Sequence, residues 1–168
     1  FVAKFRTARF LRCADEMGYA QLVAHRDRLG ASTPIHLVRT GVPMPDRAVW
    51  DQRPIDTATI CCAGTFVEKK GQRFLLEAAA RLRGDDIATR IELYGEGPFE
   101  QDLRDLADRL GISADVTFHG MVPLAELREA LQRRPILVLP SIITPDGQQE
   151  GIPVVLMGMV PGCDLYSV

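Results

Sequence analysis

The sequence has few of the residues that a metal site, a disulfide scaffold or a membrane helix needs. Its four cysteines stand at positions 13, 61, 62 and 163, without C-x-x-C spacing, and His, Cys and Asp do not cluster. No apolar run approaches the ~20 residues that span a bilayer, and no signal peptide precedes the first expected element. We therefore predict reduced core cysteines, no metal site and a cytoplasmic protein.

An excess of charge of one sign is also missing. The 20 Lys and Arg residues nearly balance the 22 Asp and Glu residues, so no basic field points to nucleic acid and no acidic tail points to a solvating segment. Small molecules are the expected partners instead. With 168 residues, of which 46% are hydrophobic, the chain can bury one sizeable core but would be cramped as two full domains.

Short apolar runs alternate with amphipathic stretches from residue 57 onward, which is the pattern of βαβ units. The predicted strands are 58–64, 90–95, 116–120 and 136–141. Helical stripes are predicted at 74, 75, 78, 79 and 82 and at 99, 103, 106, 107 and 110, with further helices at about 123–133 and from near 153. The fold class is therefore α/β, with a parallel sheet of about five strands and helices on both faces.

Residues 1–56 follow a different pattern. Helices are predicted at about 4–17 and 19–29, then a strand at 35–39 and a connector rich in Pro and Gly. Four basic residues would share the first helix, on a face interpreted as solvated or as contacting a neighbouring domain: Lys4, Arg6, Arg9 and Arg12. Because Phe1 stands within a pattern, we expect the chain to be a piece of a longer protein.

Ligands of open parallel sheets bind beyond the carboxyl ends of the strands, and the sequence has three candidate places there. After the first strand, Lys69, Lys70 and Gly71 precede a helix, which suits phosphate oxygens, although a solvated lysine pair is equally compatible. Gly95 and Gly97 follow the second strand and alone indicate only a turn. Glu150, before Gly151, can accept hydrogen bonds from sugar hydroxyls or can cap a helix.

Taken in order, the segments "AGTFVEKKGQRFLLEAAARL", "RIELYGEGPFEQDLRDLADRLGISADVTFHGMVPLAEL" and "ILVLPSIITPDGQQEGIPVVLM" resemble one known family. They are similar to the donor-binding C-terminal half of retaining glycosyltransferases with the GT-B architecture, a large family that includes sucrose, mannosyl and polysaccharide-assembly transferases. The resemblance implies that 57–168 is one Rossmann-like half, truncated at its C-terminus. Residues 1–56 would be the end of an N-terminal acceptor domain, otherwise missing, and the interdomain connector.

The resemblance also implies roles for individual residues. Lys70 would hold the diphosphate of a nucleotide sugar, and Lys70 and Glu150 would be the catalytic residues. Such enzymes need no metal or cofactor, because a lysine and helix N-termini stabilise the charge that develops on the diphosphate. The backbone near Met121 and Val122 would contact the base. The other donor-site residues would be Gly64, Thr65, Gly95, Gly97, Gly151 and Ile152.

The chain departs from the family at two positions. Thr65 stands where an arginine is usual, and Gly158 stands where a second glutamate is usual. We expect a fragment of a retaining glycosyltransferase that is inactive alone. The alternatives are an inactive nucleotide-sugar binding or assembly module and a nucleotide-sugar epimerase. His119 is interpreted as a packed residue, and the sugar, base, acceptor, oligomeric state and membrane association of the full-length protein stay open.

Overall fold

The computed structural model describes residues 2–39, 54 and 56–150, which fall into two compact units, one within 2–39 and the other within 54–150. The predicted connector and the predicted helix from near 153 lie outside the described residues. So do Gly151, Ile152, Gly158 and Cys163.

The first unit contains α1 (Val2–Thr7), β1 (Leu11–Cys13), α2 (Glu16–Arg28) and β2 (Ile35–Leu37), and its two strands pair in parallel. The side chain of Asp15 caps α2 by accepting a hydrogen bond from the N–H of Gly18 at 2.7 Å. The second predicted helix and the predicted strand at 35–39 are therefore confirmed.

The predicted first helix at 4–17 is wrong, because α1 ends at Thr7 and Leu11–Cys13 forms a strand. Backbone pairing with β2 outweighs the helical spacing of this stretch, and a hydrogen bond from Arg12 Nε to the carbonyl of Val38 at 3.1 Å extends the contact. The four basic side chains consequently do not share one helix face, since only Lys4 and Arg6 lie on α1.

The second unit holds a parallel sheet in the order β5-β4-β3-β6. Its strands are β3 (Asp56–Ala63), β4 (Arg90–Tyr94), β5 (Val116–Gly120) and β6 (Pro135–Leu137). Its helices are η2 (Glu68–Lys70), α3 (Gln72–Gly84), α4 (Glu100–Arg109), η3 (Ser113–Asp115) and α5 (Leu124–Leu131). All four predicted strands are present. The estimate of about five exceeds the four that the described part of this unit contains.

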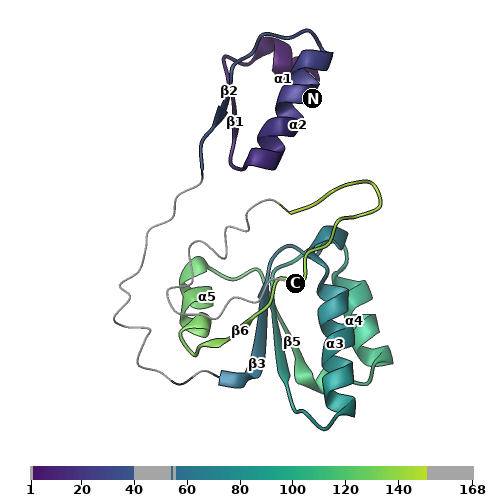
Figure 1. Ribbon diagram of the computed structural model, residues 1–168. Helices are drawn as coiled ribbons and strands as arrows, with labels where there is room; N and C mark the ends of the chain where they lie inside the picture. The colour runs from purple at the N-terminus through teal and green to yellow at the C-terminus, as the bar shows by residue number, and fades with distance from the viewer. Residues whose placement is uncertain (1, 40–53, 55, 151–168) are drawn as a thin grey trace. The chain divides into compact units, whose positions relative to one another are not determined.

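Helices cover both faces of this sheet, with α3 and α4 on one side and α5 on the other (Figure 1). The buried side chains of α3 and α4 pack on Ile60, Ile91 and Leu93 of the sheet. They are Leu75, Leu76, Ala79, Leu103 and Ala107. The predicted stripe of α3 is shifted, because Phe74 is 42% exposed and Ala78 is exposed, while Leu76 is fully buried.

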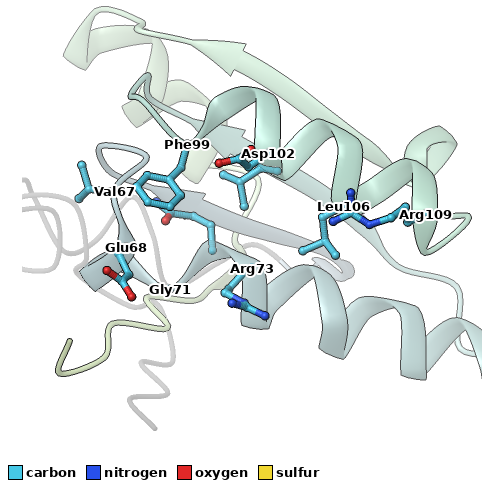
Figure 2. Close-up of a pocket in the computed structure, with 10 residues that line it drawn as sticks. Val67, Glu68, Gly71, Arg73, Phe99, Asp102, Leu106 and Arg109 are labelled. Carbon is cyan, nitrogen blue, oxygen red and sulfur yellow. The ribbon is translucent and has the colours of Figure 1, made fainter. Parts of the chain in front are cut away.

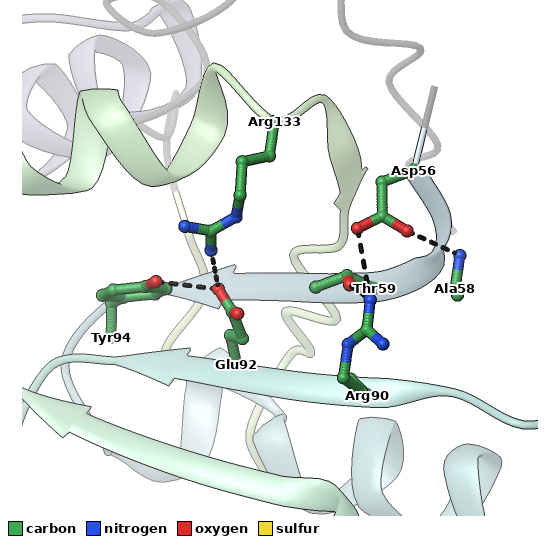
Figure 3. Close-up of polar contacts among 7 residues, drawn as sticks. All are labelled: Asp56, Ala58, Thr59, Arg90, Glu92, Tyr94 and Arg133. Atoms are coloured by element: carbon green, nitrogen blue, oxygen red, sulfur yellow. Dashed lines mark hydrogen bonds and ion pairs between the residues drawn. The ribbon is translucent and has the colours of Figure 1, made fainter. Parts of the chain in front are cut away.

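A polar cluster ties the segment after α5 to the sheet (Figure 3). The carboxylate of Glu92 on β4 accepts a hydrogen bond from the Tyr94 hydroxyl at 2.8 Å and pairs with Arg133 at 2.7 Å. Burial, together with the bond to Glu92, raises the pKa of Tyr94. The hydroxyl is therefore kept protonated as a donor to Glu92.

Candidate functional site

Two glycines bring the segments after β3 and β4 into close backbone contact. A Cβ at Gly95, where φ is +136°, would lie 2.2 Å from the carbonyl oxygen of Gly64. A Cβ at Gly97 would lie 2.3 Å from the carbonyl oxygen of Phe66, whose N–H donates to the carbonyl of Glu96 at 2.9 Å. No other residue type fits at these two positions without a backbone shift.

The segment after β5 joins the same edge of the sheet. The N–H of Gly95 donates to the carbonyl of Gly120 at 2.8 Å, and the N–H of Met121 donates to Glu96 Oε1 at 3.2 Å. The side chain of Met121 is 70% exposed, and Val122 follows it at intermediate exposure. The predicted base-contacting backbone thus lies beside the glycine turn of β4.

The segment after β6 packs against the residues around Lys70. The N–H of Ile142 donates to the carbonyl of Lys69 at 2.9 Å. Gly71 has φ +65°, and a Cβ there would lie 1.9 Å from the carbonyl oxygen of Pro140. The turn between η2 and α3 therefore requires glycine both for its left-handed backbone and for this contact.

Lys70 and Glu150 meet at this edge as an ion pair. Their Nζ and Oε2 atoms are 2.7 Å apart, and their side chains are only 18% and 19% exposed. Lys69 Nζ lies 4.0 Å from the same oxygen. The stem of Lys70 passes Gly64, since a Cβ at Gly64 would contact Lys70 Cδ and Cε at 3.6 Å.

The pKa of the buried Cys62 thiol depends on its burial and on the charge of Lys70. Burial raises the pKa of its thiol to about 12, and the positive charge of Lys70 opposes that shift. The predicted core role of Cys61 and Cys62 is confirmed, because both side chains are buried in β3, whereas Cys13 is half-buried.

Two further predicted residues lie at or near this edge. Thr65, where the family usually has arginine, has an exposed side chain, and its carbonyl accepts a hydrogen bond from the buried Gln72 side chain at 3.1 Å. His119 lies in β5 but is exposed, so the expectation of a packed residue holds only for one face of its ring. That face stacks on Tyr94 with ring centroids 4.2 Å apart.

A separate cavity of about 250 Å³ is lined by the turn that precedes α3, the first turn of α3 and one side of α4 along its length (Figure 2). It carries side chains of both charges and the half-exposed ring of Phe99. Lys70, Thr65 and Glu150 do not line it. The lining residues are Val67, Glu68, Gly71, Gln72, Arg73, Phe99, Asp102, Leu103, Leu106 and Arg109.

Sequence reasoning missed two features of the site. One is Glu96, whose carboxylate holds the Met121 turn, and the other is the direct contact between Lys70 and Glu150. The pattern "GEGP" marks a turn but does not show where its acidic side chain points. Within the described ranges, no group of three His, Cys, Asp or Glu residues is placed to hold a metal, and no helix is long and apolar enough to cross a bilayer.

Known glycosyltransferases match both the sequence and the fold. WcaL of Escherichia coli (strain K12), named as a colanic acid biosynthesis glycosyltransferase, is 34% identical over 68% of this chain. The amylovoran biosynthesis glycosyltransferase AmsK of Erwinia amylovora is 31% identical over 64% of it. The chain spans 28% and 27% of the lengths of these two relatives.

Among solved structures, TarM of S. aureus, in complex with fondaparinux, alpha-GlcNAc-glycerol and UDP, superposes on 83% of this chain with a TM-score of 0.67 and 14% identity. The superposed part is 27% of the TarM chain. WaaG, involved in lipopolysaccharide biosynthesis, covers 83% of this chain and 40% of its own, with a TM-score of 0.61 and 17% identity. At these identities the likeness concerns the fold, which is the Rossmann-like α/β fold of GT-B glycosyltransferases. The family model for glycosyl transferases group 1 matches residues 51–158, and the chain belongs to that family.

Proposed function

We propose that this chain is the donor-binding part of a retaining glycosyltransferase that takes a sugar from a nucleotide diphosphate sugar. The observation that carries the proposal is the ion pair of Lys70 and Glu150 at the carboxyl edge of the sheet. This is where ligands of open parallel sheets bind. The two charges match the two ends of such a donor, which are an anionic diphosphate and a neutral sugar rich in hydroxyl groups.

The proposed mechanism assigns one task to each charge. Lys70 stabilises the negative charge that grows on the diphosphate as the bond to the sugar breaks, so a metal ion is not required for this step. Glu150 accepts hydrogen bonds from sugar hydroxyls and orients the sugar. The backbone of Met121 and Val122 contacts the base.

The acceptor and the final product belong to the larger protein. We propose that a further N-terminal domain binds the acceptor, because the curated relatives are more than three times as long as the matched part. The names of WcaL and AmsK suggest that the product is a bacterial polysaccharide. Several structural relatives were solved with UDP or with UDP and glucose, which makes a UDP-sugar the first donor to test.

Calorimetric titration with UDP, GDP and ADP and with their hexose esters tests the donor assignment. At least one nucleotide should bind, and Lys70→Ala should weaken that binding. Absence of binding by every nucleotide, or equal binding by Lys70→Ala, would reject the proposal. The rate at which sugar is released from the bound donor, measured by chromatography, then reports catalysis.

A binding module without catalysis is the second candidate, and Thr65 favours it. Its hydroxyl replaces the guanidinium that the family usually presents to the phosphates, so one positive charge fewer faces the leaving group. In the full-length protein, nucleotide binding without sugar release, including after Thr65→Arg, would support this candidate. Recovery of sugar release in Thr65→Arg would support the transferase.

A further inference from the structure

The ion pair of Lys70 and Glu150 means that the two charges of the proposed donor site neutralise each other. The ammonium group proposed to bind the diphosphate already has an anionic partner at 2.7 Å, and Lys69 Nζ is 4.0 Å from the same oxygen. Both members of the pair are more than four-fifths buried. An entering diphosphate therefore competes with Glu150 for Lys70.

The carboxylate of Glu150 also retains unused acceptor capacity. Its Oε2 atom is buried, and within the described residues no donor meets that atom with the geometry of a hydrogen bond, so the lysine ion pairs are its contacts. A carboxylate oxygen accepts hydrogen bonds readily from hydroxyl groups. A ligand that brings hydroxyl groups to this oxygen compensates for the loss of Lys70, whereas a ligand without them does not.

A nucleoside diphosphate and its sugar ester differ in the group that would face Glu150. The terminal phosphate of the free diphosphate carries up to two negative charges at neutral pH, because the second pKa of a phosphate monoester is about 6. Esterification by a sugar removes one of these charges and adds hydroxyl donors. Like charges close together repel, so Glu150 disfavours the free diphosphate more than the sugar ester.

We propose that Glu150 is the specificity-determining residue by which the site distinguishes a nucleotide sugar from the free nucleoside diphosphate. The proposal rests on the proposed donor site. The same carboxylate pairs with Lys70, receives the sugar hydroxyls of the donor, and repels the terminal phosphate of the product. Release of the product is then assisted by the return of Glu150 to Lys70.

The test compares the affinity of wild type and Glu150→Gln for UDP and UDP-glucose, and for GDP and GDP-mannose, by calorimetry. The glutamine keeps the size and the hydrogen-bonding oxygen but removes the charge. We expect the variant to bind the free diphosphate roughly three- to tenfold more tightly, the worth of a partly screened ion pair. Its affinity for the nucleotide sugar should not rise.

Glu68→Gln is the matched control. Glu68 lies in the same short helix as Lys70 and is exposed, so its substitution removes an identical charge near the site. The ratio of the two affinities should stay at its wild-type value in this control. The gain in Glu150→Gln should also shrink below about pH 6, where the terminal phosphate takes up a proton.

The outcomes separate this proposal from the donor assignment. An unchanged or weaker affinity of Glu150→Gln for the diphosphate overturns the role of Glu150, and so does an equal gain in Glu68→Gln. If Lys70→Ala still loses nucleotide affinity in that case, the donor site itself stands. If no variant binds any nucleotide, both proposals are rejected. Glu150→Asp keeps the charge but withdraws it by one methylene, so its ratio of affinities for the free diphosphate and the nucleotide sugar should lie between those of wild type and Glu150→Gln. This second variant keeps the proposal testable if Glu150→Gln does not fold.

Discussion

Glu92 and Glu150 have nearly the same local geometry but different surroundings. Each carboxylate meets a basic side chain at 2.7 Å, and the two side chains are 18% and 19% exposed. Glu92 lies within β4 and also accepts the hydroxyl of Tyr94, so two donors fix it (Figure 3). Glu150 lies beyond the carboxyl end of the sheet, beside the turn that carries Lys69 and Lys70.

The difference shows why an ion pair alone does not identify a site. Arg133 and Tyr94 satisfy Glu92 from two elements, and this cluster anchors the crossover between α5 and β6 on the sheet. Lys70 and Glu150 join only segments that follow strands, where glycines let neighbouring backbone segments approach closely. We therefore assign a structural role to the first pair and a ligand-exchanging role to the second.

The largest effect on the Lys70 side of this comparison is expected at Gly71, which shapes the turn that carries Lys70. Gly71→Ala should lower the free energy of unfolding by about 3 kcal/mol, because a left-handed backbone conformation costs ~1 kcal/mol or more for alanine and the backbone must also move. The new Cβ would lie 1.9 Å from the carbonyl oxygen of Pro140. Denaturant unfolding followed by circular dichroism measures the loss.

Gly84→Ala is the control for that substitution. Gly84 is the last residue of α3, and a Cβ there would meet nothing within 4 Å. Its stability should rise or stay level, since alanine favours the helix by up to ~1 kcal/mol. A stable Gly71→Ala variant would contradict the close packing of this turn on the segment after β6.

Much of the fold around this turn follows from the sequence. Short β-rich runs that end at Gly or Ser alternate with helical patterns in this part of the sequence, so all four strands of the second unit were predicted to within a few residues. The three-residue strand Leu11–Cys13 was missed, because its stability comes from pairing with Ile35–Leu37 and not from a local pattern. The stripe of α3 was misplaced because two stripes one residue apart both have helical spacing, the predicted one at 74, 75, 78, 79 and 82 and the buried one at 72, 75, 76 and 79.

The candidate site was predictable only in part. The position of Lys70 after the first strand follows from the alternation of strands and helices. Its contact with Glu150 does not, because 80 residues separate the two and the fold alone brings them together. The hydrogen bond from Met121 to Glu96 was missed for the same reason, since the glycine turn allows many directions for that side chain.

Lys70 and Lys69 should contribute differently to the nucleotide affinity of the protein, although they are adjacent. Lys70→Ala should weaken binding of a nucleoside diphosphate by roughly 1.5 to 3 kcal/mol, the usual range for a hydrogen bond to a charged group. Lys69→Ala should matter little, because its Nζ is 4.0 Å from Glu150 and its side chain is 32% exposed. Equal losses in calorimetry would indicate nonspecific attraction, and no loss in either would remove the phosphate role.

Substitution of Glu92 and substitution of Glu150 should have different effects on the free energy of unfolding. Glu92→Ala should lower the free energy of unfolding by about 2 kcal/mol, because it leaves the buried Tyr94 hydroxyl and Arg133 without their acceptor. Glu150→Ala should lower it by less, because among the described residues no donor meets Glu150 Oε2 with hydrogen-bond geometry, whereas Glu92 accepts two hydrogen bonds. Urea unfolding of both variants measures the difference. A larger loss for Glu150→Ala would contradict the assignment of Glu92 as the structural member.

A third carboxylate, Asp56 at the start of β3, extends the comparison to acid pH with the smallest expected effect. A hydrogen bond from the Thr59 side chain lowers the pKa of Asp56, helped by the N–H of Ala58 and the charge of Arg90 (Figure 3). A carboxyl group with a lowered pKa in the folded state stabilises the fold above its unfolded pKa of about 3.9. This contribution is lost as the pH falls through the folded value. Asp56→Asn keeps an acceptor for Ala58 but cannot ionise, so its stability should approach that of wild type between pH 4 and pH 2. Thermal unfolding of both proteins across this range measures the difference in stability between wild type and Asp56→Asn. A difference that does not change with pH would show that the ionised Asp56 contributes no stability.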